Sequence, residues 1–138
     1  SAYLSSKSAD MIAVKQLFAN SLEDYKSKCE LVLNSELCFN SAIAITAKSA
    51  KNIRVIAAQA ADELLGIKSV DASYVIFPIE DGVNISARSL GKVNVQLVME
   101  SLGGGGHHTM AAVQLKDVTV EQAREMLLNK LDEQTYNT

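Results

Sequence analysis

The sequence lacks the features of fibrous, disordered and membrane-spanning chains. Its 138 residues include one proline and seven glycines, too few for a collagen-like or low-complexity chain. No apolar run approaches the roughly 18–20 residues that a membrane-spanning helix needs. Residues 1–7 also lack the charged and then apolar order of a secretory signal. We therefore expect a soluble cytoplasmic domain and leave open a membrane anchor on a longer parent protein.

Cysteine and positive charge are also scarce. Cys29 and Cys38 are the two cysteines. They form neither a disulfide framework nor the paired spacing of a zinc site, so reduced thiols are expected. The formal net charge of −3 argues against a protein that coats duplex nucleic acid, because such proteins are usually basic. An anionic ligand would have to be held by a local positive patch against the overall field.

What is present is the composition of one globular domain, with 48% apolar and 21% charged residues. Apolar stripes at 11–18 and 22–32 predict two short lead-in helices, the second starting at Ser21. Further along, the predicted strands cover 42–46, 74–79, 83–89 and 111–116, and the predicted helices cover 49–65, 95–102 and a segment from Thr119. This order predicts an α/β (α+β) fold with a mixed sheet of about four to five strands. We divide the chain into a helical lead-in, 1–34, and a main domain, 35–138.

Three local signals refine this prediction. Asp81 and Gly82 lie between two apolar runs and predict a β-hairpin. Pro78 indicates that the first strand of this hairpin has a locally unpaired edge. Thr119 and Gln122 form a capping box at the start of the last helix, which is expected to bury Ala123, Leu127 and Leu131.

The glycine run Gly103, Gly104, Gly105 and Gly106, followed by His107 and His108, is the most informative stretch. Glycine tolerates positive φ and lets backbone N–H groups approach a ligand closely, so successive N–H groups can form an anion-binding concavity. An imidazole can donate a hydrogen bond to a phosphate oxygen. The alternative is a flexible loop with two surface histidines. A metal site is not predicted, because neighbouring histidines seldom point at one ion and no carboxylate–histidine cluster surrounds them.

The strand at 83–88 alternates, with Asn84, Ser86 and Arg88 on one face. A guanidinium can bind a phosphate with two parallel hydrogen bonds, so Arg88 is a candidate phosphate ligand. The alternative is a solvated outer face, which such alternation usually indicates. Asn94 begins the next helix, where it could cap the helix or flank a bound anion.

The segments that carry a family resemblance are 86–89, 94–96, 103–107 and 111–112, supported by 58–65 and 72–76. Together they resemble the DHH-associated domain of the DHH phosphoesterases, in particular the membrane-anchored cyclic-di-AMP phosphodiesterases of the GdpP type. The resemblance covers roughly residues 8 to 132. It implies a preceding DHH domain that holds two metal ions, typically manganese, and to which 1–34 would lead.

The resemblance also implies a set of nucleotide contacts. The implied substrate-binding residues are Ser86, Arg88, Ser89, Asn94, Gly103, Gly104, Gly105, Gly106, His107 and His108. Of the two histidines we favour His107, because it follows the glycines directly. The chain has no Asp-His-His motif, so we expect no catalytic residue, metal or other cofactor in it and no activity of the chain alone.

Three functions remain in view. The first is the substrate-binding part of a metal-dependent phosphodiesterase for cyclic dinucleotides, with the DHH domain as partner in cis and a homodimer as a further possibility. The second is a module of a nanoRNase or RecJ-like exonuclease. Such proteins usually stack single strands on aromatic side chains, and three Phe and four Tyr make this function less favoured. The third is a stand-alone nucleotide sensor.

Overall fold

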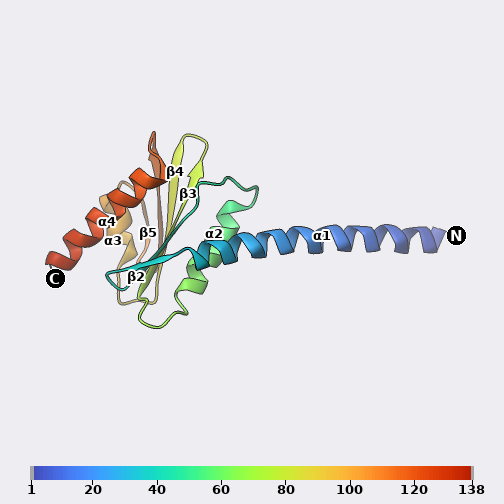
Figure 1. Ribbon diagram of the computed structural model, residues 1–138, viewed down its shortest axis with the longest axis horizontal. Coiled ribbons are helices and arrows are strands. Elements are labelled where there is room, and N and C mark those ends of the chain that lie inside the picture. Colours follow the sequence, from blue (N-terminus) through green and yellow to red (C-terminus); the bar gives the residue numbers. More distant parts are fainter. Residues whose placement is uncertain (1, 138) are drawn as a thin grey trace.

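A mixed six-stranded sheet forms the centre of the molecule (Figure 1). The computed structural model describes the backbone of residues 2–137, and the side chains of 10–15 and 22–134. The strands are β1 (Glu36–Cys38), β2 (Ser41–Ile45), β3 (Ala72–Ile79), β4 (Gly82–Ser89), β5 (Gly105–His107) and β6 (Met110–Lys116), in the order β1-β2-β3-β4-β6-β5. Only the β2–β3 pair is parallel among the pairs in this sheet. The predicted α/β class is confirmed, and the short strands β1 and β5 account for the two that were not predicted individually.

Helices cover the two faces of the sheet unequally. Helices α3 (Val95–Ser101) and α4 (Val120–Asn137) pack on one face, where Tyr74, Ile85 and Leu127 belong to the apolar core. Helices α1 (Ala2–Leu33) and α2 (Ile53–Leu64) pack on the other face, against β2 and β3. This second core includes no residue of β4, β5 or β6. In the described part of the chain, one face of these three strands therefore has no apolar core packed on it.

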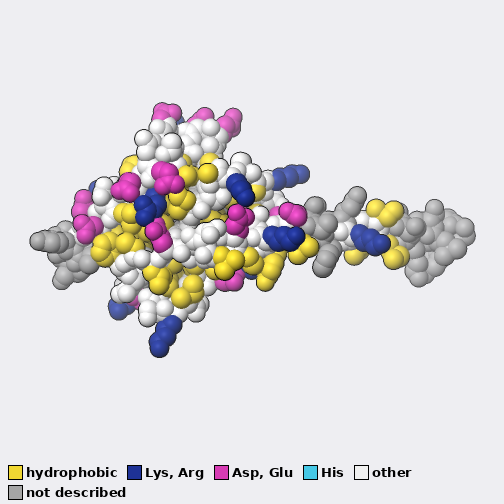
Figure 2. Space-filling model, viewed as in Figure 1, with side chains coloured by type: hydrophobic (Ala, Val, Ile, Leu, Met, Phe, Trp, Pro, Cys, Tyr) yellow, Lys and Arg dark blue, Asp and Glu magenta, His cyan; other side chains and the backbone are white. Residues whose placement is uncertain are grey.

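The prediction of two lead-in helices is wrong, because α1 is one continuous helix that projects from the body (Figure 1). No glycine or proline separates the two stripes, and the four-residue step from 18 to 22 continues a single helical face. A helix start at Ser21 is therefore also wrong. Met11, Ile12 and Val14 are exposed on the projecting part (Figure 2). In the part of the chain that the structure describes, no helix has the length and apolar character to cross a membrane.

The local signals in the hairpin and the last helix are confirmed. Ile79 pairs with Gly82 across the predicted turn, and Pro78 lies beyond Ile76, the last β3 residue that pairs with β2. The Thr119 amide donates to Gln122 Oε1 at 2.9 Å, and the Gln122 amide donates to Thr119 Oγ1 at 3.1 Å. Helix α2 begins at Ile53, four residues later than predicted.

An ion pair joins α4 to the edge strand β1. Arg124 donates from Nε to Glu36 Oε1 at 2.5 Å and from Nη2 to Oε2 at 3.0 Å. These hydrogen bonds lower the pKa of the Glu36 carboxyl below its ordinary value. A depressed folded-state pKa adds stability that is present above the unfolded pKa, about 4.3, and is lost as the pH falls through the folded one.

We expect Glu36→Gln to lower the free energy of unfolding at pH 7 by about 0.5–1 kcal/mol, since solvent screens this exposed pair. At pH 3 the difference from the unmodified chain should shrink, because the carboxylate is then partly protonated. Urea unfolding at both pH values measures this, with the exposed Glu80→Gln as the control. An equal loss at both pH values would contradict the role of the charge.

Candidate functional site

The face of β4, β6 and β5 that α3 and α4 do not cover carries four of the candidate residues, Ser86, Arg88, Gly105 and His107, and we call it the open face. Strand pairing aligns Arg88 with Met110 and Met110 with His107, so these three side chains form one row across three strands. A second row joins Ser86, Ala112 and Gly105 in the same way. The residues between them in sequence, such as Ile85 and Val113, point to the opposite face and pack in the core.

The first row places two nitrogen donors on either side of an exposed methionine. Neighbouring strands lie about 4.8 Å apart, so the backbones of Arg88 and His107 are separated by roughly 10 Å. Met110 between them is 49% exposed. His107 is exposed, and no hydrogen bond of its ring is found among the residues whose side chains are described. A ligand above Met110 would therefore reach both a guanidinium and an imidazole.

The second row is shallow and adds a hydroxyl donor. Asn84 Nδ2 donates to Ser86 Oγ at 3.1 Å, so the Ser86 O–H remains free to donate toward the open face. Ala112 is exposed, and a Cβ built on Gly105 would meet nothing within 4 Å. Between Ser86 and Gly105 the open face thus has a floor with almost no side-chain volume.

Arg88 is anchored by a carboxylate from helix α2. Its Nη1 donates to Asp62 Oδ1 at 2.8 Å, and the Arg88 side chain is 19% exposed against 61% for Asp62. The bond uses one of the five N–H donors of the guanidinium. Arg88 therefore retains donors for an anionic ligand while its direction is restrained.

The first two residues of the glycine run close a helix, whereas the sequence predicts an anion-binding loop, and ligand contacts by these four glycines stay a prediction. The amides of Gly103 and Gly104 donate to Glu100 O at 3.0 Å and Met99 O at 2.7 Å, so they close helix α3. Positive φ occurs at Gly103 (98°) and Gly106 (146°), and not at Gly105. From Gly105 onward the run is the edge strand β5. On the open face, Gly105 therefore leaves the space above β5 free of side-chain atoms.

Three predicted site residues lie away from the open face and stabilise the 89–94 connection instead. Buried Ser89 donates from Oγ to Val93 O at 2.6 Å and accepts from the Gly91 amide at 2.8 Å. Asn94 caps α3 by accepting from the Leu97 amide. His108 Nε2 lies 2.7 Å from Gly91 O. Of the two histidines, His107 is thus the one that lies in the same row as Arg88. Ligand contacts by Ser89, Asn94 and His108 stay predictions.

Sequence reasoning gave no role to Asp62 and Met110. The alternation of 110, 112 and 114 with the buried Ala111, Val113 and Leu115 would have placed Met110 and Gln114 on one strand face. Asp62 carries no such signal, because its approach to Arg88 depends on how α2 packs on the sheet.

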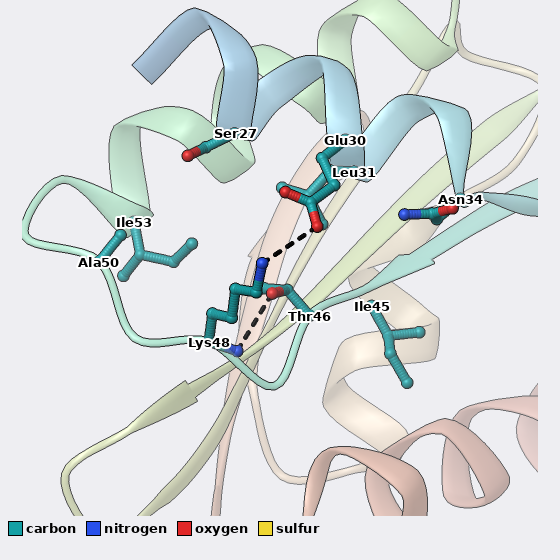
Figure 3. Close-up of a pocket in the computed structure, with 9 residues that line it drawn as sticks. All are labelled: Ser27, Glu30, Leu31, Asn34, Ile45, Thr46, Lys48, Ala50 and Ile53. Atoms are coloured by element: carbon teal, nitrogen blue, oxygen red, sulfur yellow. Dashed lines mark hydrogen bonds and ion pairs between the residues drawn. The ribbon is translucent and has the colours of Figure 1, made fainter. Parts of the chain in front are cut away.

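A separate cavity of about 60 Å³ lies under α1, at the end of β2 (Figure 3). Lys48 is one of the residues that line it, and donates from Nζ to Glu30 Oε1 at 3.2 Å and from its amide to Thr46 Oγ1 at 3.1 Å. This volume holds about two water molecules and not a nucleotide. Within the described residues no group of three or more His, Cys, Asp and Glu is arranged to hold a metal ion. We take the open face as the candidate site because Arg88, Ser86 and His107 are aligned on it.

The chain is similar to a known domain family and to two curated proteins that share one printed activity. The DHHA1 domain model matches residues 39–137. The chain is 44% identical, over 94% of its length, to the cyclic-di-AMP phosphodiesterase PdeA of Listeria monocytogenes serotype 1/2a (strain 10403S), of which it covers 20%. It is 45% identical, over 91% of its length, to the cyclic-di-AMP phosphodiesterase GdpP of Geobacillus thermodenitrificans (strain NG80-2), of which it covers 19%.

A solved structure shares the fold. An exopolyphosphatase-related protein from Bacteroides fragilis superposes with a TM-score of 0.72 at 21% identity, covering 80% of this chain and 34% of that one. The chain spans about a fifth of the length of the curated relatives it matches.

Proposed function

Because this chain belongs to the family of DHHA1 domains, we propose that it is the substrate-binding domain of a larger cyclic-di-AMP phosphodiesterase. The observation that carries this proposal is the row of Arg88, Met110 and His107 on the open face. The substrate is inferred from the printed activities of the relatives that are 44% and 45% identical. A cyclic dinucleotide carries two phosphodiester groups, which suit donors of this kind.

The donors of the open face fit an anion better than a divalent cation. Arg88, Ser86 and His107 offer N–H and O–H groups, whereas the nearby carboxylate of Asp62 is paired with Arg88. Manganese and magnesium favour carboxylate and water oxygens. We therefore propose that a preceding DHH domain in cis would hold the metal ions, which when bound supply an activated water for attack on phosphorus.

In this proposal the chain's own residues bind and orient the phosphate. Arg88 would hold one phosphoryl oxygen through its free N–H groups, and Ser86 and His107 would donate to other oxygens of the same substrate. Hydrogen bonds to charged groups contribute about 1.5–3 kcal/mol each. Donors that lie where charge develops on the phosphoryl oxygens would also stabilise the transition state.

The isolated chain is expected to bind weakly and to hydrolyse nothing. Half of a two-domain cleft lacks the opposing contacts, so the dissociation constant for cyclic-di-AMP should be no tighter than roughly the millimolar range. NMR titration should nevertheless shift the amides around Arg88 and His107. With manganese, the chain alone should release no linear dinucleotide, whereas the protein that includes the preceding domain should.

The titration and the hydrolysis assay together separate the other functions. Micromolar binding by the isolated chain would favour a stand-alone sensor. If the longer protein degrades short single-stranded oligonucleotides and leaves cyclic-di-AMP intact, the exonuclease function replaces the proposed one. Shifts confined to residues away from the open face would contradict the proposed site.

A further inference from the structure

Among the residues whose side chains the structure describes, Asp62 is the one outside β4–β6 whose side chain bonds to the side chain of a proposed substrate ligand. Its Oδ1 accepts from Arg88 Nη1 at 2.8 Å. A long arginine side chain loses rotamer entropy when it is ordered. A partner that restrains Arg88 before the ligand arrives removes part of that cost from binding.

The backbone of Asp62 is held in place by the packing of α2. Its neighbours Ala60, Ala61 and Leu64 are fully buried. The Ala61 carbonyl accepts a buried hydrogen bond of 2.7 Å from Ser73 Oγ, and Ser73 is the β3 residue that pairs with Arg88. The helix that carries Asp62 is therefore fixed to β3 at Ser73, the residue that lies directly across from Arg88 in the sheet.

Helix stability does not explain an aspartate at this position. Asp62 lies in the last turn of α2, which ends at Leu64. A negative charge near a helix C-terminus is unfavourable, because the helix dipole is negative there. The adjacent Glu63 has the same disadvantage and pairs instead with Lys28 of α1, at 2.9 Å.

We propose that Asp62 is a positioning residue, which directs the Arg88 guanidinium over the open face for phosphate binding. This inference rests on the proposed function, since it requires that Arg88 binds the substrate. It differs from the opposite electrostatic expectation, in which Asp62 only competes with the phosphate for Arg88. The two expectations predict opposite effects when the charge of residue 62 changes.

The test uses the full-length protein and steady-state hydrolysis of cyclic-di-AMP. Asp62→Asn should lower kcat/KM by roughly two- to fivefold, the value of a partly exposed ion pair. Asp62→Lys, which repels the guanidinium, should lower it further, by about tenfold or more. Asp62→Glu should restore most of the activity of the unmodified protein. Glu63→Gln and Glu63→Lys make the same charge changes one residue away and should leave kcat/KM unchanged.

A double-mutant cycle with Arg88→Ala separates positioning from a general structural effect. In the Arg88→Ala background, Asp62→Asn should have no further effect on kcat/KM, because the group that it positions is gone. An increase in kcat/KM for Asp62→Asn or Asp62→Lys, or an equal loss in both backgrounds, overturns the positioning role. If Arg88→Ala alone changes nothing, the proposed function itself fails, and the two failures are thereby distinguished.

Discussion

Replacing Arg88 by alanine in the full-length protein should lower kcat/KM for cyclic-di-AMP by roughly ten- to a hundredfold, which corresponds to the loss of one charge-assisted contact of about 1.5–3 kcal/mol. Folding should be almost unaffected, because the Asp62 carboxylate that loses its partner is 61% exposed. The measurement is steady-state kinetics together with thermal melting.

Two further variants sharpen the Arg88 experiment. Arg88→Lys keeps the charge and loses the planar fork of donors, so its activity should lie between those of the alanine variant and the unmodified protein. Lys92→Ala removes a positive charge that is 78% exposed on the 89–94 connection and should have no effect. Unchanged kinetics of Arg88→Ala with normal melting would mean that Arg88 lies on an ordinary solvated strand face.

Gly105→Val should abolish most substrate binding while the domain stays folded. A Cβ at Gly105 meets nothing within 4 Å, its φ is not positive, and valine is favourable in strands. The added methyl groups would instead fill the space beside Ser86 and Ala112, in the second row of the open face. We expect a loss of at least about tenfold in kcat/KM and little change in melting temperature.

Gly106→Val is the matched control for this experiment. Gly106 has a φ of 146°, and a Cβ there would lie 2.5 Å from Met110 O and from Ala111 Cα. Such strain costs about 1–3 kcal/mol before any clash, so this variant should lose stability.

Because Gly105 and Arg88 would contact one ligand, their double mutant should be less than additive in kcat/KM. Full additivity would contradict a shared ligand, and a lowered melting temperature of Gly105→Val would contradict the open space.

How far the sequence predicted the fold depended on how local each signal was. The Thr119 capping box and the hairpin at Gly82 involve neighbouring residues, and both were predicted correctly. The strand β5 was missed because three residues with two glycines have no periodicity and little strand propensity. The prediction divides helix α1 in two because Ser21 and Asp24, three residues apart, resemble a capping box, although neither glycine nor proline occurs there to end the first helix.

The candidate site was predictable in composition and only partly in arrangement. Alternation placed Ser86 and Arg88 on one strand face, and the structure agrees with that assignment. That His107 lies in the same row as Arg88 depends on two strand registers, which follow from the whole sheet and not from either segment alone. The resemblance also names Ser89 as a substrate ligand. Its side chain, one residue after Arg88, lies on the opposite face and donates a hydrogen bond to Val93 O in the following loop.

The two sides of the open face are supported unequally by the sheet. Arg88 lies on β4, which is hydrogen-bonded to β3 on one side and β6 on the other, whereas His107 lies on β5, a three-residue edge strand bonded to β6 alone. Strands with partners on both sides exchange their amide protons only in large unfolding events, and short edges open in small local ones. We therefore expect the backbone around His107 to open locally more readily than the backbone around Arg88.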